Sequence, residues 1–215
     1  MAKIMAFSGS PIRNGSIEKG LEAVLEATGL EYELVRLSEI DMRVCMGCKG
    51  CVGSNRCVID DGVNPLLEKI EKAQGLVLSA FPSFGSVNAL TKVFIERNWP
   101  LRHRDMLTQG KAGAAVVCGG SGPKELAGYL EGYFTRYLRM SFLGALVLEG
   151  NVPCLSCGFG ETCPGSGVLA KYGPGARIAP GMFNDFSQDR AARGRATELG
   201  QALARAIEGS RAGVA

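Results

Sequence analysis

Residues 3–25 read K-I-M-A-F-S-G-S-P-I-R-N-G-S-I-E-K-G-L-E-A-V-L, and the fold can be inferred from this stretch outward. The first five residues form a short apolar run, which predicts a buried strand. A polar segment of Gly and Ser follows, and after it apolar residues recur at the spacing of a helix, at Ile17, Leu21, Val24 and Leu25. The chain is therefore expected to begin with a strand, a turn and a helix.

The same alternation continues along the chain. Four further strands are expected at residues 32–37, 75–80, 112–118 and 143–148. Four further helices are expected at residues 63–70, 88–99, 126–137 and 190–207. Strands that alternate with helices predict an α/β fold with a parallel sheet covered on both faces. Five such strands fit a doubly wound, flavodoxin-like sheet of order 2-1-3-4-5, whose ligand lies beyond the carboxyl ends of the strands.

The 215 residues predict one domain in three parts. Residues 1–150 form the flavodoxin-like part, with a cysteine-rich loop inserted at 42–61. Residues 151–189 are rich in Gly, Pro and Cys and are expected to be irregular. Because such a segment is too long to be an idle connection, it is expected to bind a ligand or face a partner. Residues 190–215 supply the last helix and a tail.

Composition excludes several classes of function. The net charge of +3 is too small to argue for nucleic acid. No apolar run approaches the roughly eighteen residues of a membrane span, and the start of the chain lacks the pattern of a signal peptide. The single histidine, His103, argues against multi-histidine metal sites and a histidine-based triad. We expect a cytoplasmic protein without a nucleic-acid or membrane partner.

Half of the eight cysteines lie in the run C-M-G-C-K-G-C-V-G-S-N-R-C, as Cys45, Cys48, Cys51 and Cys57. Four thiolates in one loop need a positive centre, which an iron–sulfur cluster or zinc provides. Three cysteines at successive two-residue spacings favour a 4Fe–4S cluster, since zinc usually draws on two well-separated C-x-x-C pairs. Zinc, a disulfide and redox-active thiols remain open alternatives.

A second group of cysteines lies in residues 151–189, at Cys154, Cys157 and Cys163. These residues can hold a second cluster or zinc with a ligand from elsewhere, form a redox disulfide, or have no special role.

The loop after the first strand is suited to an anion. It stands before a helix N-terminus, where backbone N–H groups and the helix dipole favour negative charge. Because the G-x-G-x-x-G fingerprint is absent, a terminal phosphate fits better than a dinucleotide. The candidate residues are Ser8, Ser10, Arg13, Asn14, Gly15, Ser16 and Ile17.

Two more loops follow later strands. The second loop offers apolar and aromatic surface, at Phe81, Pro82, Ser83, Phe84, Gly85, Ser86 and Val87. The glycines of the third loop let a flat ring approach main-chain N–H groups; its residues are Gly119, Gly120, Ser121 and Gly122. Together with the anion loop, they describe a pocket for a phosphate joined to a planar heterocycle.

The chain resembles the iron–sulfur flavoproteins, a flavodoxin-fold branch related to the NADPH-dependent FMN reductases. The resemblance covers about residues 3–150 and rests on five motifs: G-S-P-I-R-N-G-S at 9–16, C-x2-C-x2-C-x5-C at 45–57, D-D at 60–61, F-G-S-V at 84–87 and K-V-F-I-E-R at 92–97. It implies FMN, with its phosphate at Ser10, Arg13, Asn14 and Ser16, and a 4Fe–4S cluster at the four cysteines.

The resemblance also implies homodimers or homotetramers in which a cluster lies near the flavin of a neighbouring subunit. Electrons would pass from a ferredoxin-like donor, or NAD(P)H, through the cluster and FMN to an unidentified acceptor. The alternatives are an NAD(P)H-dependent FMN or quinone reductase with a structural metal, and a redox-sensing electron carrier. Because the cysteine loop directly follows the second strand, the cluster is expected beside the flavin edge of the sheet.

Five other residues have plainer expected roles. Cys118 is expected in the core or lining the pocket, and His103 on the surface or at an interface. Trp99 is expected in the core or at an interface. Asp61 is expected, with its neighbour Asp60, to cap the following helix.

Overall fold

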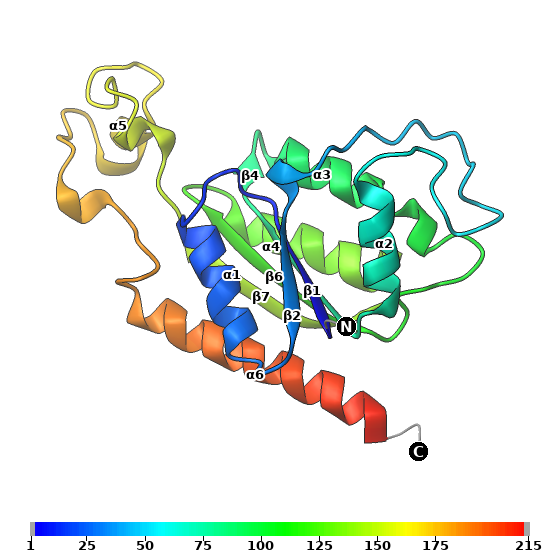
Figure 1. Cartoon of the computed structure of the whole chain (residues 1–215). Coiled ribbons are helices and arrows are strands. Elements are labelled where there is room, and N and C mark those ends of the chain that lie inside the picture. The colour runs from blue at the N-terminus through cyan, green and yellow to red at the C-terminus, as the bar shows by residue number, and fades with distance from the viewer. Residues whose placement is uncertain (1–2, 213–215) are drawn as a thin grey trace.

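The computed structural model describes residues 3–212, so the expected tail at 213–215 lies outside the described residues. A sheet of five parallel strands forms its centre (Figure 1). The strands are β1 (Ile4–Ser8), β2 (Tyr32–Arg36), β3 (Gly75–Ala80), β6 (Ala112–Gly119) and β7 (Ser141–Glu149). Their order is β2-β1-β3-β6-β7, which confirms the predicted flavodoxin-like order.

Helices cover both faces of the sheet. They are α1 (Ser16–Glu26), α2 (Val63–Lys72), α3 (Ala89–Glu96), α4 (Pro123–Gly132) and α6 (Arg190–Ala212). Alternate strand residues point to opposite faces, so Met5 and Phe7 pack in one core with α2, α3 and α4. Ile4 and Ala6 pack in the other core with α1 and α6. The parallel sheet is buried on both sides, as its apolar strands require.

The structure adds elements that periodicity does not reveal. The loop after β3 contains a small antiparallel hairpin of β4 (Pro82–Ser83) and β5 (Ser86–Val87). The segment expected to be irregular contains a short helix, α5 (Gly167–Tyr172). It begins there because the Ser166 side chain accepts the N–H groups of Val168 and Leu169, as an N-cap does. After α4, one π turn at Tyr133–Tyr137 continues the helix.

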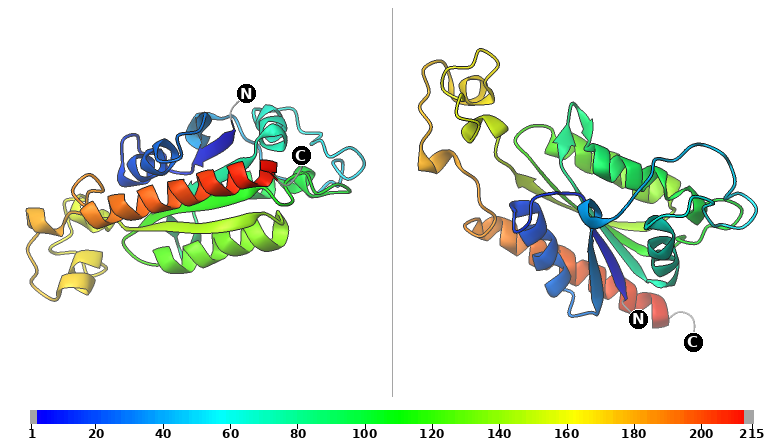
Figure 2. Two further views of the ribbon diagram at one scale, coloured as in Figure 1. Left: turned by 90° about the horizontal axis from the view of Figure 1, so that it is seen from below. Right: turned by 45° about the horizontal axis from the view of Figure 1, so that its top comes forward.

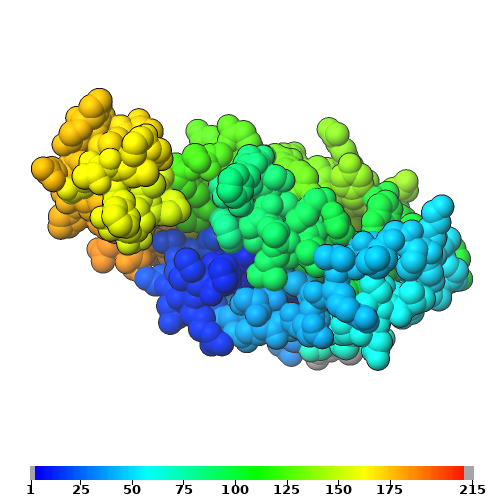
Figure 3. All heavy atoms as spheres, turned by 90° about the horizontal axis from the view of Figure 1, so that it is seen from above, coloured from blue at the N-terminus to red at the C-terminus, as the bar shows by residue number. Residues whose placement is uncertain are grey.

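The two cysteine-rich segments lie at opposite ends of the molecule. Figure 2 shows residues 151–189 as a lobe beyond α1 and α4, whereas the loop at 42–61 emerges beside α2. The space-filling view shows the same separation, with the yellow lobe and the cyan loop at the two ends of one face (Figure 3). Among the described residues, no helix is long and apolar enough to cross a membrane.

Helices α1 and α6 approach each other closely at Gly200. A Cβ atom there would lie 2.3 Å from the Val24 carbonyl oxygen and 2.7 Å from the Ala27 Cβ. In the same helix, the site of Gly194 is open, with no atom within 4 Å of an added Cβ. Alanine at position 194 therefore tests helix propensity alone, whereas alanine at position 200 tests helix propensity together with packing against α1.

We expect Gly200→Ala to destabilise the protein by about 1–3 kcal/mol, because the added methyl meets backbone that cannot give way. Gly194→Ala should stabilise it by up to about 1 kcal/mol, since alanine is the better helix former. Urea unfolding of the two variants and the wild type measures both effects. A stabilising Gly200→Ala would show that α1 and α6 are not in close contact.

Candidate cofactor sites

All four cysteines of the 42–61 loop line one cavity of about 260 Å³. The cavity lies between this loop and the end of α3, and its other walls include Met46, Val58, Ile59, Arg97 and Trp99. All eight cysteines of the chain are free thiols. The structure therefore brings together the whole thiol set that the sequence predicts as one ligand group.

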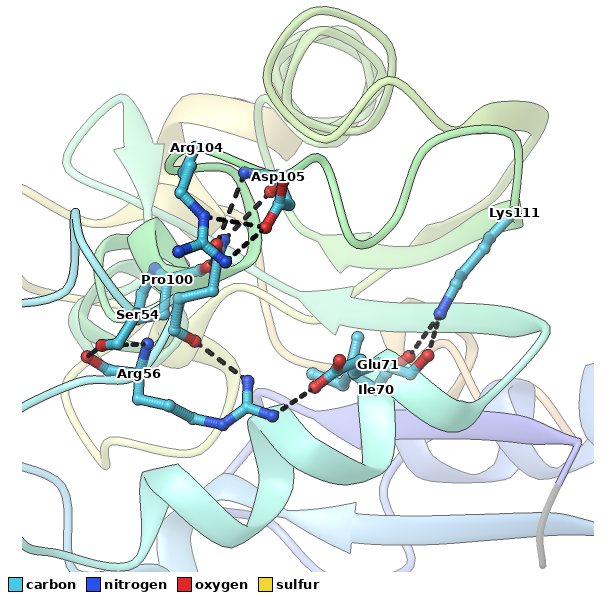
Figure 4. A network of polar contacts seen from close by, with 9 residues as sticks. Ser54, Arg56, Ile70, Glu71, Pro100, Arg104, Asp105 and Lys111 are labelled. Atoms are coloured by element: carbon cyan, nitrogen blue, oxygen red, sulfur yellow. Dashed lines mark hydrogen bonds and ion pairs between the residues drawn. The ribbon is translucent and has the colours of Figure 1, made fainter.

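Buried and exposed polar contacts anchor the cysteine loop to the body. Asn55, a buried residue in the left-handed region, donates from Nδ2 to the Pro100 carbonyl at 2.6 Å and the Asp105 carbonyl at 3.0 Å. Arg56 reaches Glu71 of α2 at 2.8 Å (Figure 4). Arg104 donates to the loop carbonyl of Gly53 at 2.7 Å. These contacts hold a loop that has little apolar core of its own.

A fully buried ion pair fixes the end of the loop to α3. Arg97 donates from Nη1 and Nη2 to the two carboxylate oxygens of Asp61, at 2.5 and 3.0 Å, and neither side chain is exposed. The same guanidinium donates to the Arg43 carbonyl at 2.7 Å and lies 3.5 Å from Cys57 Sγ. Asp61 Oδ1 also accepts the N–H of Val63, the first residue of α2, but the N-cap position itself is Gly62, which has no side-chain cap.

Two groups set the charge at the cavity, Cys51 and the buried ion pair. Burial raises the pKa of Cys51, and the neighbouring Cys57, Cys45 and Cys48 raise it further, which favours the neutral thiol. Burial alone would raise the pKa of Asp61, but the bonds from Arg97, Arg43 and Val63 lower it to about 2. Asp61 therefore stays ionised and neutralises Arg97.

The chemistry of the donor set fits an iron–sulfur cluster, since thiolates are the ligands of such clusters and all four thiols line one cavity. Between residues 3 and 212, however, no group of three or more Cys, His, Asp or Glu side chains is arranged so that it could hold a metal ion. The thiols therefore share a cavity without being in a ligand arrangement.

The second and third loops meet around another cavity, of about 250 Å³, at the carboxyl edge of the sheet. The hairpin contributes Pro82, Phe84, Gly85, Ser86 and Val87, and the third loop contributes Ser121 and Gly122. The structure thus confirms that these two loops, far apart in sequence, form one hollow. Helix α4 adds Glu125, Leu126 and Tyr129, which sequence reasoning missed.

Some predicted flavin residues serve to pack the loops together. A Cβ at Gly119 would lie 2.4 Å from the Pro82 ring, and a Cβ at Gly120 would lie 2.7 Å from Val152. Phe81 packs on the core formed with α1 and α6, and neither it nor Ser83 lines the cavity. Gly119 and Gly120 are needed because the loops contact each other there. Of the third loop, only Ser121 and Gly122 line the cavity.

Asn88 joins the first two loops. Its side chain is buried; Nδ2 donates to the Gly9 carbonyl at 2.9 Å, and Oδ1 accepts the Phe81 N–H at 3.3 Å and the Thr91 hydroxyl at 3.0 Å. Asn88 stands at the N-cap position of α3, but its side chain caps no backbone N–H of that helix. It connects the anion loop to the hairpin.

The first loop keeps an open helix N-terminus. The N-cap of α1 is Gly15, and no side chain caps the helix. Its first-turn N–H groups are therefore placed to bind an anion. Ser8 Oγ is buried without a hydrogen-bond partner among the described residues, and Ser10 Oγ accepts the Ile12 N–H. Ile17 buries its side chain in the core, so only its backbone N–H remains for a ligand.

Glu18 is a buried neighbour of the anion loop that the sequence analysis missed. It is buried in the first turn of α1, accepts the Asn14 N–H at 2.6 Å and pairs with Arg36. Arg13 in turn pairs with Glu39 at 2.5 Å. In this structure Arg13 and the Asn14 N–H therefore bind carboxylates. The Ser side chains of the anion loop and the first-turn N–H groups of α1 remain for a phosphate.

Phe84 lies in a strained and exposed position. It occupies the turn of the β4–β5 hairpin with φ +48°, followed by Gly85 at φ +75°. Two successive positive φ values match the hairpin turn that favours Asn-Gly, and a bulky residue there is strained. The Phe84 ring is fully exposed beside the edge cavity, which suits a contact with a ligand.

The two cavities lie at opposite ends of α3. The hairpin precedes the first residue of this helix, whereas Glu96 and Arg97, which end it, line the cysteine cavity. Eight helical residues span about 12 Å. The expectation that the cysteines lie beside the flavin edge is therefore wrong within one chain, because the loop extends past α2 to the far end of α3.

Of the remaining expectations, the buried place of Cys118 is confirmed, whereas Trp99 is 44% exposed and therefore not a core residue; the interface roles of Trp99 and His103 stay predictions. Cys118 is buried, and burial raises its pKa to about 11. His103 and Trp99 stack with ring centres 5.1 Å apart, and both line the cysteine cavity, which the sequence did not predict. Cys154, Cys157 and Cys163 all belong to the segment 151–189, which forms a lobe at the end of the molecule away from the loop at 42–61 (Figure 2).

We expect Arg97→Met to destabilise the protein by about 3–5 kcal/mol, because it leaves a buried carboxylate unpaired. The double variant Arg97→Met/Asp61→Asn should recover most of that loss, since no buried charge remains. Anaerobic urea unfolding of the single variant, the double variant and the wild type tests this. A double variant as unstable as Arg97→Met would show that the ion pair is not the source of the effect.

Comparison with known proteins places this architecture in a family. The model of NADPH-dependent FMN reductases matches residues 2–152. Iron–sulfur flavoproteins of Methanocaldococcus jannaschii and Methanosarcina thermophila are each 34% identical to the chain, over 123 and 122 residues. The alignments cover 55% of this chain and 63% and 64% of those proteins. The chain thus spans less than two thirds of the length of these relatives.

Solved structures show the same fold. RosB with bound 8-demethyl-8-formylriboflavin-5'-phosphate aligns with 99% of this chain and 81% of its own, at a TM-score of 0.67 and 15% identity. A flavodoxin from the domain Archaea aligns with 95% of this chain and 98% of its own, at a TM-score of 0.54 and 10% identity. Since the family model matches well over half of its residues, the chain belongs to the NADPH-dependent FMN reductase family.

Proposed function

We propose that the protein is a flavin-dependent oxidoreductase that carries FMN at the sheet edge and a 4Fe–4S cluster at Cys45, Cys48, Cys51 and Cys57. Electrons pass between a ferredoxin-like donor, the cluster and FMN to an acceptor that the chain does not identify. The observation that carries the proposal is the pair of cavities, one lined by all four thiols and one built from the predicted flavin loops. Relatives named iron–sulfur flavoproteins support it.

The cysteine cavity supplies what such a cluster needs from the protein. The four thiols lose their protons when they become ligands. Arg97 places a hydrogen-bond donor 3.5 Å from Cys57 Sγ, and Met46 and Ile59 give the cavity an apolar wall. Hydrogen bonds to sulfur and limited solvent exposure tune the reduction potential. All eight free thiols agree with a reducing compartment, the cytoplasm.

The edge cavity and the adjoining loop provide the parts of an FMN site. The open N-terminus of α1 accepts the phosphate. Pro82, Phe84 and Tyr129 offer surface to the ring, and Ser121 and Gly122 offer main-chain groups. When bound, FMN exchanges one or two electrons and the cluster one, so together they connect one-electron donors to two-electron acceptors.

We also propose that the protein acts as a homodimer or homotetramer. The two cavities of one chain are separated by the length of α3. A second subunit can place its flavin edge against the cysteine cavity of the first. Large exposed apolar side chains near both cavities, Met46, Trp99 and Phe84, are consistent with such a contact.

The matched family model favours a second candidate, an NAD(P)H-dependent FMN or quinone reductase in which the cysteine loop holds a structural metal. In that case NADPH reduces the flavin directly, and loss of the metal from the cysteine loop leaves this rate unchanged. A third candidate, a redox-sensing electron carrier, reduces both centres without turning over an acceptor. Parallel anaerobic reduction by ferredoxin and by NADPH separates the three.

The anaerobically purified protein should contain FMN and about four irons per chain, as the cluster requires. Cys48→Ser/Cys51→Ser should lose the iron and retain FMN, because the two sites lie at opposite ends of α3. Iron analysis and flavin absorbance measure both contents. Wild-type protein with neither iron nor flavin would refute the proposal, and ferredoxin-driven flavin reduction that survives the loss of iron would exclude the cluster from the path.

Phe84→Asn should stabilise the flavin-free protein by up to about 1 kcal/mol, because Asn tolerates positive φ better than a bulky ring. The same change should weaken FMN binding several-fold, since it removes the exposed ring beside the cavity. Urea unfolding and fluorescence titration with FMN measure the two effects separately. Unchanged FMN affinity would show that Phe84 does not contact the flavin.

A further inference from the structure

We propose that a third cavity, between α3 and α4, binds a small hydroxylated aromatic carboxylate. This cavity has a volume of about 310 Å³. It shares Trp99 with the cysteine cavity and Tyr129 with the edge cavity, but among the described residues no cysteine and no residue of the hairpin lines it. The site is therefore distinct from both cofactor sites, and binding there does not depend on the proposed function.

Aromatic side chains form much of the wall of this cavity. They are Trp99, Tyr129, Tyr133 and Tyr137. Tyr133 is buried, whereas the other three rings remain exposed to solvent. Several exposed aromatic rings around one hollow indicate a binding site, and small-molecule cavities are typically lined by aromatic side chains with a few polar groups. The rings favour a flat aromatic ligand, which can meet them face to face or edge to face.

Arg102 supplies a positive charge that the protein does not neutralise. Its guanidinium carbon lies over two rings of the wall, 5.0 Å from the centre of the Trp99 ring and 5.2 Å from that of Tyr137. In the described part of the chain, the Arg102 side chain forms no ion pair and no hydrogen bond. Contacts through the face of a guanidinium position it and leave its N–H groups free. Such a group can bind a carboxylate through two parallel hydrogen bonds.

The other two charged side chains of the wall neutralise each other. Lys92 and Glu96 form an ion pair at 3.2 Å, one turn apart on α3. Among the residues that line the cavity, Arg102 is then the one with an uncompensated charge. A single guanidinium matches the single negative charge of a carboxylate, whereas a phosphate monoester carries about 1.5–2 negative charges at pH 7. The charge balance therefore favours a carboxylate over a phosphate.

Asn98 adds a polar group that the fold leaves without a partner. It lines the cavity, its side chain is buried, and its Nδ2 donates to the Tyr133 hydroxyl at 2.5 Å. Its Oδ1 accepts no hydrogen bond from the described residues. With the amide turned over, Nδ2 would be the free atom instead. A phenolic hydroxyl both donates and accepts, so a hydroxyl on the ligand ring satisfies Asn98 in either orientation.

The test titrates the full-length, anaerobically purified protein with 4-hydroxybenzoate in a calorimeter. The matched control ligand is 4-hydroxybenzyl alcohol, which keeps the ring and the hydroxyl but lacks the carboxylate. Arg102→Gln removes the free charge, and Arg136→Gln makes the same change at an exposed arginine that does not line the cavity. We expect similar Kd values for the acid in wild type and Arg136→Gln. Binding should be about tenfold weaker or more in Arg102→Gln, and equally weakened for the alcohol in wild type, since both changes remove a charge-assisted bond.

Tryptophan fluorescence locates the bound ligand. Trp99 is the one tryptophan of the chain, so its emission should change with the same midpoint as the heat in wild type and in Arg136→Gln. The inference is overturned by a wild type that does not bind the acid, by equal affinities for acid and alcohol, by an unchanged Kd in Arg102→Gln, or by binding that leaves the Trp99 emission unchanged. FMN and iron contents are measured on the same samples, so failure here is distinguished from failure of the proposed function.

Discussion

The buried ion pair between Arg97 and Asp61 is the contact on which the cysteine cavity depends. Residues 42–61 leave the sheet after β2 and return at α2 with few apolar side chains to bury. Arg97 compensates by binding the carboxylate of Asp61, the Arg43 carbonyl and Cys57 Sγ with one guanidinium. It joins both ends of the loop to α3. A buried Lys could not make these planar, forked contacts, so the loop geometry depends on Arg at this position.

The sequence predicts the sheet well because local patterns and general topology rules suffice for it. Apolar runs mark each strand, and right-handed crossovers leave few possible strand orders. The site is predicted less completely, because its details depend on contacts between distant residues. Glu18 and Tyr129 are indistinguishable from other helix residues in sequence. Gly119 suggests a ligand, but its missing side chain accommodates Pro82. The cysteine cavity lies at the far end of α3 because of contacts to Asn55 and Arg97 that spacing does not reveal.

Placing the two cavities at opposite ends of α3 separates two conflicting requirements. A phosphate site needs exposed N–H groups and positive potential at a helix start, whereas four thiolates bring negative charge. At one edge, the thiolates would repel the phosphate. Separation by α3 removes that repulsion within the chain. The homodimer or homotetramer proposed above would be needed to bring a cysteine cavity and a flavin edge together.

The lobe at 151–189 lies almost wholly beyond the matched family region, which ends at residue 152, but it contacts the start of α1 inside that region. Asp185 pairs with Lys19 of α1 at 3.1 Å, and the Phe186 N–H donates to Ser16 Oγ at 3.4 Å. The exposed ion pair contributes little, whereas burial of the Phe186 ring in the core contributes more. Because Ser16 begins the helix whose N-terminus faces the anion loop, the position of this lobe and the order of the phosphate site are linked. Any constraint that orders the lobe therefore acts directly on the start of α1.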